Sequence, residues 1–329
     1  MKVCITGGNG YIGIHTVYEL VRQDHEVIVV SRTIDNKDKP LCKNVRFYQE
    51  DIMNKEKISE ILGKENELGK IDVVMHFAGL LDAKESLEKP YEYYMINVLG
   101  TANVLKAMAE NKIKNILFTS TSLVYGKLNE SSWSENAKTS PINPYGETKL
   151  AAEKLIKWMC ERYDMNYCIF RCFNVAGADE SLDIGLSKKN SKFLVPSMVE
   201  TALGLRDKPM TIMGNDYDTK DGTCIRDYVH IQDLADANIL GAEYIMNNNK
   251  SVILNLGNGE GYTVLEMVKM VEKYHPINYQ VGPGRPGDPA KIVANNEQIK
   301  KILKWTPKRN LDDIIRSDFE YRKKLNNIK

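Results

Sequence analysis

The sequence predicts an α/β fold, a doubly wound parallel sheet followed by a smaller C-terminal domain. Short apolar, β-branched segments alternate with helix-patterned segments through the first half of the chain, which is typical of a parallel sheet covered by helices on both faces. A glycine-rich turn directly follows the first such segment. After Asn174 the alternation stops, and Gly, Asp, Lys and Ser cluster over residues 177–192. We therefore expect a Rossmann-like first domain.

Six strands are expected before residue 175. They lie within the segments KVCITGG, EVIVVSR, VRFYQED, DVVMHFAG, NILFTSTS and YCIFRCFN. Helical spacing of apolar residues predicts helices within 12–23, 91–110 and 147–163. We expect a dinucleotide-binding domain at 1–175 and a second domain at 176–329. Later segments near 225–260, including VILNLG, are expected to return to the first sheet.

Composition excludes several classes of protein. The chain has 329 residues, enough for two domains at about 150 residues each. Hydrophobic residues make up 43%, charged residues 27%, and the net charge is +1, which argues against disorder and against nucleic-acid binding by bulk positive charge. No apolar run is long enough to span a bilayer, and the opening MKVCITGG lacks the apolar core of a signal peptide.

The six cysteines lack the spacing of metal sites and redox motifs. There is no C-x-x-C pair and no Cys/His zinc pattern, so we predict no metal. In a chain of this length the cysteines are expected to be reduced and mostly buried, and we predict a cytoplasmic protein without a membrane partner.

The segment TGGNGYIG predicts a phosphate-binding turn. Gly7, Gly10 and Gly13 lie between the first strand and the first helix. Glycines at these positions allow a tight turn and a close approach of the backbone to a pyrophosphate, and the N-terminus of the helix supplies free N–H groups and partial positive charge. We expect a dinucleotide cofactor here; the alternative is a purely structural turn.

The end of the second strand indicates which dinucleotide binds. Proteins that bind NAD usually place an acidic residue about 20 residues after the glycines. This chain has Ser31 and Arg32, which suit the 2′-phosphate of NADP. We therefore expect a preference for NADP(H). The alternative is that Arg32 is solvated and the ribose is held elsewhere, for example by Asp35, so that NAD remains possible.

Tyr145 and Lys149 form a candidate catalytic pair. They lie four residues apart at the start of a predicted helix and therefore share one face. A free tyrosine has a pKa of about 10, and a nearby ammonium group lowers the pKa of the phenol. The strand upstream ends in hydroxyls at residues 119–122, one of which is expected to hydrogen-bond the reacting oxygen. The alternative is an interfacial tyrosine beside a solvated lysine.

Together, TGGNGYIG, HFAG, the hydroxyl-rich strand end and Y-x-x-x-K resemble the extended short-chain dehydrogenase/reductases. Within this family the chain is most similar to the group of UDP-glucose 4-epimerases. The similarity is carried by MGNDYDTKDGTCIRDYVHIQDLADA at 213–237 and by RCFNVAG, LNLGNG and GRPGDP, and it covers nearly the whole chain.

The resemblance implies an NAD(P)-dependent enzyme that acts on a UDP-sugar. Thr121 takes the place of the family's catalytic Ser or Thr, beside Tyr145 and Lys149. With the glycines, Ser31 and Arg32 already named, the candidate cofactor residues are Gly7, Gly10, Tyr11, Ile12, Gly13, Ser31, Arg32, Asp51, Ile52, Phe77, Ala78, Gly79, Asn97, Tyr145 and Lys149. Those implied for the substrate are Thr121, Asn174, Tyr217, Arg226, Arg285, Asp288 and Ile292. The family also implies a homodimer that pairs through helices at 91–110 and 147–163.

Four positions depart from the epimerase pattern. Ser31 replaces the ribose-binding acid, Leu81 a lysine, and Phe193 an asparagine. Ile292 stands where some members carry a larger tyrosine, so that an N-acetyl group at sugar C2 would fit. The insertion at 180–192 is also shorter than in typical epimerases.

These departures lead us to expect NADPH-dependent reduction of a UDP-4-keto-(6-deoxy, N-acetyl) hexose, because net reduction consumes a reduced cofactor in each turnover. The alternative is a UDP-glucose/UDP-N-acetylglucosamine 4-epimerase with bound NAD, which shows no net redox change. A non-catalytic NADP sensor that retains the fold is a third possibility.

Overall fold

The computed structural model describes residues 1–34, 45–128, 133–188, 190–284 and 288–328. The chain forms two compact units. Unit 1 comprises Met1–Gly126, Ala137–Cys172 and Ala235–Leu254, and unit 2 comprises Lys127–Asn136, Phe173–Leu234 and Asn255–Lys329. Among the described residues, no helix is long and apolar enough to cross a membrane.

A seven-stranded sheet dominates unit 1 and confirms the predicted fold class. Its order is β10-β6-β5-β4-β1-β2-β3, with parallel pairing from β3 through β6. The strands are β1 (Lys2–Thr6), β2 (Glu26–Ser31), β3 (Val45–Gln49), β4 (Val73–His76), β5 (Asn115–Thr121), β6 (Asn166–Cys172) and β10 (Val252–Leu256). The order reverses between β1 and β4, where ligands bind in open α/β sheets.

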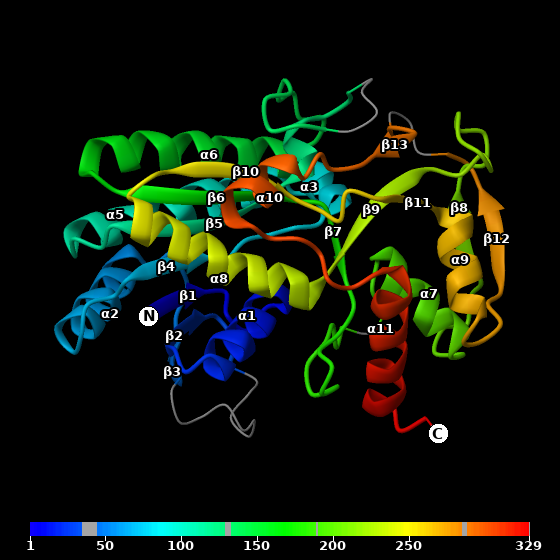
Figure 1. Ribbon diagram of the computed structural model, residues 1–329, viewed down its shortest axis with the longest axis horizontal. Coiled ribbons are helices and arrows are strands. Elements are labelled where there is room, and N and C mark those ends of the chain that lie inside the picture. The colour runs from blue at the N-terminus through cyan, green and yellow to red at the C-terminus, as the bar shows by residue number, and fades with distance from the viewer. Residues whose placement is uncertain (35–44, 129–132, 189, 285–287, 329) are drawn as a thin grey trace. The chain divides into compact units, whose positions relative to one another are not determined.

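Helices cover both faces of this sheet (Figure 1). One face packs against α2 (Lys55–Glu67), α5 (Gly100–Glu110) and α6 (Pro144–Tyr163). The other carries α1 (Tyr11–Arg22) and α8 (Ile231–Asn248), which are joined by a 3.0 Å hydrogen bond from Asn238 to Thr16. Helix α6 begins at Pro144, earlier than the predicted 147, because the Asn143 side chain caps the N–H of Gly146 and proline suits the first helical position.

The helix expected over 91–110 is interrupted. It consists of α4 (Pro90–Tyr94), a π-helical turn at Met95–Leu99 and α5, preceded by the short α3 (Ala83–Glu88). A π-helical turn inserts an extra residue into the helix and often marks a functional site. Here it contains the buried Asn97.

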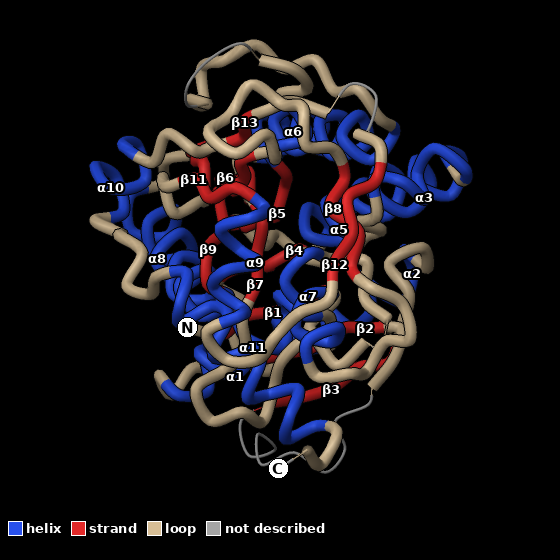
Figure 2. The backbone as a smooth tube through the Cα atoms, turned by 90° about the vertical axis from the view of Figure 1, so that its right-hand side faces the viewer, coloured by secondary structure: helices blue, strands red, loops and turns tan. Residues whose placement is uncertain are grey.

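The described residues of unit 2 form two small sheets and four helices besides its share of α8. The strands of the first sheet are β7 (Asn174–Ala176), β9 (Ile225–His230), β11 (Gly261–Thr263) and β13 (Lys291–Ile292); β8 (Met210–Met213) pairs with β12 (Tyr279–Gly282). The helices α7 (Leu194–Ala202), α9 (Val264–Glu272) and α11 (Leu311–Leu325) contribute to one apolar core, and α10 (Glu297–Leu303) precedes α11. Figure 2 shows α7, α9 and α11 close together.

The turn between β1 and α1 leaves no room for side chains. Gly7 has φ +72°, and a Cβ placed on it would lie 2.6 Å from the backbone N of Ala78. A Cβ on Gly13 would lie 2.3 Å from the carbonyl oxygen of Gly7. Because the colliding atoms belong to the backbone, the turn itself would have to move.

We expect Gly13→Ala to lower the free energy of unfolding by about 3 kcal/mol, at the upper end of the cost of overpacking, because the Gly7 carbonyl is fixed by the turn. Gly204→Ala is the control. Gly204 has φ +67° and nothing within 4 Å of its added Cβ, so only the conformational cost of about 1 kcal/mol applies. Urea unfolding of both variants measures the difference, and equal losses would contradict the steric explanation.

Candidate active site

Thr121, Tyr145 and Lys149 come together at the carboxyl end of β5. Thr121 is the last residue of β5, and Tyr145 and Lys149 lie one turn apart at the start of α6. All three are buried, with exposures of 7%, 9% and 6%. A hydrogen bond joins Thr121 to Tyr145, and the Lys149 ammonium donates to the Thr119 carbonyl oxygen at 2.7 Å. The predicted trio therefore forms one cluster.

Burial determines the electrostatics of this cluster. It raises the pKa of the Tyr145 phenol, and the hydrogen bond with Thr121 opposes that rise. It lowers the pKa of Lys149 to about 8, against the opposing influence of Cys172 and Glu153. The Lys149 ammonium also lies 4.4 Å above the ring of Phe118, a cation–π contact. The group that lowers the Tyr145 pKa is thus Thr121, whereas the sequence pointed to Lys149.

The glycine turn fits a dinucleotide. Its Gly7 N–H bonds the Val30 carbonyl at 2.8 Å, which places the turn at the carboxyl ends of β1 and β2. Gly10 is the N-cap residue of α1, and it makes no side-chain capping hydrogen bond to the first turn, which begins at Tyr11. Any Cβ at Gly7 would fill this cradle. These features suit a pyrophosphate next to a helix N-terminus.

The segment after β4 lies beside the same turn. Phe77 donates its N–H to Thr6, and Ala78 faces Gly7. Gly79 leaves space beside Asn97 and Lys149, since its added Cβ would lie 2.9 Å from Asn97 Oδ1 and 3.9 Å from Lys149 Nζ. These residues line the region where β1 and β4 diverge, and their contact with a cofactor stays a prediction.

Asn97 makes its contacts within the protein. Its amide donates to the Leu80 carbonyl at 3.1 Å and to Thr148 Oγ1 at 3.0 Å, and its Oδ1 accepts the Leu80 N–H at 2.8 Å. It therefore ties the segment after β4 to α6 at the residue before Lys149. These three hydrogen bonds satisfy the polar atoms of the Asn97 amide, which is buried in the π-helical turn.

The remaining predicted cofactor residues lie at the ends of β2 and β3. Ser31 is half-buried as the last residue of β2, and Arg32 is exposed. Asp35 lies outside the described residues. Asp51 accepts the Met53 N–H at 2.9 Å, and Ile52 packs where a side chain on Gly100 would collide with it.

Three of the predicted substrate residues lie on the small sheet of unit 2, and two more lie in the loops that precede its strands β9 and β13. Arg226 on β9 pairs with Asp288 at 2.7 Å and lies in register with Ile292 on β13. Asn174 on β7 donates its amide to the Asp227 carbonyl at 2.9 Å. The ring of Tyr217 packs against Gly214 and Gly284. Arg285 lies outside the described residues.

Two sets of buried polar residues near the trio were missed by the sequence reasoning. His76 lies between the hydroxyls of Thr6, at 2.6 Å, and Thr101, at 2.9 Å; burial and the charge of Lys149 lower its pKa to about 3. The second set is a buried ion pair of Glu153 and Arg171. The available signals were the histidine directly before FAG and a glutamate four residues after Lys149.

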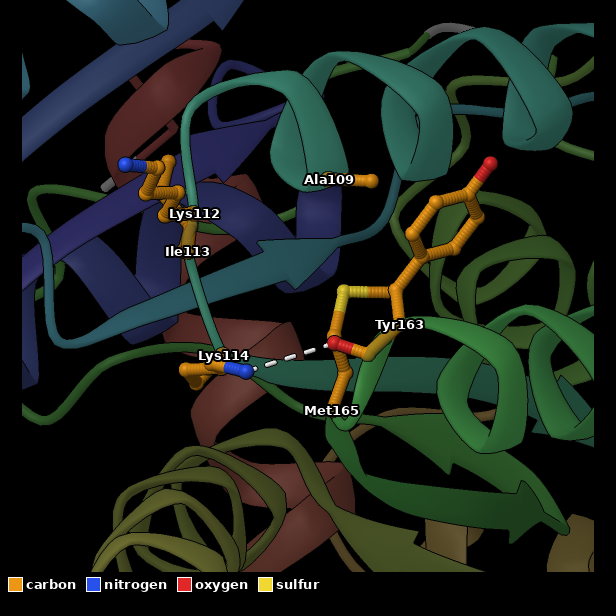
Figure 3. A pocket seen from close by; sticks show the side chains of 6 residues that line it. All are labelled: Ala109, Lys112, Ile113, Lys114, Tyr163 and Met165. Carbon is orange, nitrogen blue, oxygen red and sulfur yellow. Dashed lines mark hydrogen bonds between the residues drawn. The ribbon is translucent and has the colours of Figure 1, made fainter.

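A surface depression of unit 1 is unrelated to this cluster. Figure 3 shows it lined by Ala109, Lys112, Ile113, Lys114, Tyr163 and Met165. It lies at the amino end of β5, whereas Thr121 lies at the carboxyl end. Lys114 donates to the Tyr163 carbonyl at 3.3 Å across it.

The chain shares its architecture with proteins of known family. A family model described as GDP-mannose 4,6 dehydratase matches residues 4–317. The UDP-glucose 4-epimerase of Halalkalibacterium halodurans is 41% identical over 313 residues, which cover 94% of this chain and 91% of that protein. The chain belongs to the epimerase and dehydratase branch of the extended short-chain dehydrogenase/reductases. It is an NAD(P)-dependent enzyme of this family.

Solved structures agree with this assignment. UDP-glucose 4-epimerase from Stenotrophomonas maltophila, with bound NAD and formylated UDP-arabinopyranose, has a TM-score of 0.93 and 31% identity over 100% of both chains. The enzyme from Bifidobacterium longum, in complex with NAD+ and UDP, has a TM-score of 0.89 and 34% identity over 100% of both chains. These relatives carry NAD. The comparisons support neither the predicted preference for NADP(H) nor the predicted reductase.

We expect Lys149 in the cofactor-free protein to lose its proton near pH 8, because burial disfavours its charge. In the unfolded chain it titrates near 10.4, so between these values the unfolded state binds more protons, and this group makes stability rise with pH. ¹³C NMR of lysine-labelled protein, with Lys149→Met to assign the signal, measures the titration. A midpoint above pH 10 would contradict the buried environment.

Proposed function

We propose that the chain is a UDP-hexose 4-epimerase that keeps NAD bound during turnover. The observation that carries this proposal is the buried cluster of Thr121, Tyr145 and Lys149 at the carboxyl end of β5, in a chain similar over 94% of its length to a UDP-glucose 4-epimerase. An epimerase needs one proton acceptor and donor at the sugar and a redox cofactor that is regenerated in each cycle. Tyr145 supplies the first.

Tyr145 takes the proton from the 4-hydroxyl of the sugar and returns it to the same oxygen. Thr121 hydrogen-bonds Tyr145 and is positioned to hold the 4-oxygen. A protonated Lys149 favours the phenolate form of Tyr145, which accepts this proton and forms again when the proton is returned. NAD, when bound, supplies hydride acceptance and return at sugar C4.

The UDP moiety is assigned to unit 2. The Arg226 guanidinium suits a pyrophosphate, and Asp288, which pairs with it here, suits a ribose diol. Asn174 and Tyr217 lie on the same small sheet and its adjoining loop, and Arg285 is the second predicted arginine. Ile292 is buried beside Arg226, and its modest size favours acceptance of an N-acetyl group at sugar C2. A homodimer through α4, α5 and α6 remains a prediction of the family resemblance.

We expect the purified protein to interconvert UDP-galactose with UDP-glucose, and the N-acetyl forms with each other, without added cofactor. Product analysis by chromatography measures both reactions. Tyr145→Phe is expected to lower kcat at least 100-fold, because the proton acceptor is lost, while NAD released on denaturation stays stoichiometric. Consumption of NADPH with a 4-keto sugar, together with failure to interconvert the four UDP-sugars, would overturn the epimerase.

We expect the wild type to retain NAD in preference to NADP, although Ser31 and Arg32 lie at the end of β2. Fluorescence titration of the cofactor-stripped protein with NADH and NADPH measures this preference. Arg32→Asp should weaken NADPH binding by at least tenfold and leave NADH within a few-fold, since repulsion between the new carboxylate and a 2′-phosphate acts on NADPH alone. Tighter binding of NADPH by the wild type would contradict the assignment of NAD.

A further inference from the structure

A buried ion pair lies directly behind the catalytic trio. The Arg171 guanidinium donates to both carboxylate oxygens of Glu153, at 3.1 and 2.8 Å, and Ser120 donates to the same carboxylate at 2.5 Å. Glu153 is 1% and Arg171 4% exposed. On its other side Arg171 lies 4.9 Å from the ring of Tyr125.

Ser120, Glu153 and Arg171 belong to three different elements of the catalytic region. Ser120 precedes Thr121 on β5, Glu153 lies one helical turn after Lys149 on α6, and Arg171 lies on β6. The carboxylate therefore joins the strand that carries the catalytic hydroxyl to the helix that carries the tyrosine and the lysine. A shift of α6 along β5 would break all three hydrogen bonds.

Stability alone is a weak explanation for this pair. The desolvation of two buried charges offsets much of their attraction, and apolar residues of similar volume often replace such pairs without loss. Fixed geometry is a better explanation, because a bidentate guanidinium–carboxylate contact specifies orientation as well as distance.

The pair also affects the charge balance around Lys149. The titratable groups that interact electrostatically with this ammonium are Glu153 on its own helix, Cys172 on β6 and His76 on β4. His76 is neutral, and burial raises the pKa of the Cys172 thiol to about 12, so both lack charge at neutral pH. Of these three groups, Glu153 alone supplies a negative charge.

We propose that Glu153, held by Arg171 and Ser120, is a positioning residue that orients α6 against β5 and helps to keep Lys149 protonated during turnover. The kinetic part of this inference rests on the proposed epimerase, because it concerns the same Tyr145 and Lys149. The part that concerns the charge of Lys149 holds for any reaction at this site.

The test is Glu153→Gln, which keeps the shape of the side chain but removes its charge and replaces one acceptor oxygen by an NH2 donor. We expect kcat to fall about 10- to 100-fold with KM changed less than threefold, as for misplaced catalytic groups that still bind substrate. The alkaline limb of the kcat profile should move to lower pH, because Lys149 loses its proton more easily. An unchanged pH profile would overturn the proposal.

Glu65→Gln is the matched control. Glu65 is also fully buried and accepts from Arg46 and Tyr48, but it lies on α2, away from β5 and α6. Removal of the Glu65 charge should lower the melting temperature and leave the pH profile of kcat unchanged. If the alkaline limb of the kcat profile moved as far in Glu65→Gln as in Glu153→Gln, the shift would be a general effect of lost charge. That result would overturn the specific role of Glu153.

The double variant Glu153→Leu, Arg171→Met separates stability from catalysis. It replaces the pair by apolar residues, so the free energy of unfolding should return close to the wild-type value while kcat stays reduced. Recovery of both stability and kcat would show that the pair only fills space and would overturn the proposal. If the double variant fails to fold, Glu153→Gln and Ser120→Ala carry the same kinetic test.

A measurement without substrate keeps the two proposals separate. ¹³C NMR of labelled lysine follows Lys149 in the wild type and in Glu153→Gln. We expect the midpoint to fall by at least half a pH unit in the variant, whatever sugar the enzyme uses. If the wild type fails to epimerise UDP-sugars but this shift occurs, the proposed function fails and the electrostatic role of Glu153 stands; an unshifted midpoint overturns the latter.

Discussion

The desolvation of Lys149 is the constraint on which the catalytic region depends. An ammonium group with 6% exposure requires fixed oxygen acceptors and nearby negative charge, since water cannot stabilise it. The Thr119 carbonyl supplies the acceptor, the Phe118 ring supplies a cation–π contact, and Glu153 supplies the charge. The same burial removes water from Tyr145, whose phenol depends on Thr121 to favour the ionised form.

The parallel sheet makes this arrangement possible. Because β1, β2, β4 and β5 run in one direction, their carboxyl ends meet at one edge, and the glycine turn, the segment after β4 and Thr121 all lie there. The π-helical turn at Met95–Leu99 adds a second tie at this edge. Its Asn97 holds Leu80 and Thr148, so the helix carrying Lys149 is fixed from both sides of the trio.

The similarity of the chain to NAD-bound epimerases outweighs its few departures from the epimerase pattern. Ser31 and Arg32 suggested a 2′-phosphate, but a single exposed guanidinium at a strand end is a weak constraint on cofactor choice. Similarity to NAD-bound epimerases over the whole chain rests on many more positions. The change of charge at Ser31 and Arg32 is thus a poorer guide to the reaction than the motifs that this chain shares with the epimerases along its length.

The sequence by itself determined the fold class and the strands of the first sheet and pointed to Tyr145 and Lys149, because alternating apolar segments, a glycine turn and an i, i+4 pair are local patterns. Thr121 was singled out among the hydroxyls at 119–122 by the family resemblance. Only the tertiary structure decided the break in 91–110, the buried His76 and the joining of Ser120, Glu153 and Arg171. These depend on contacts between residues far apart in the chain: Glu153 and Arg171 read as ordinary charged residues until α6 packs on β6. Burial makes Glu153 and Arg171 a desolvated ion pair, and this burial arises only when the elements pack together.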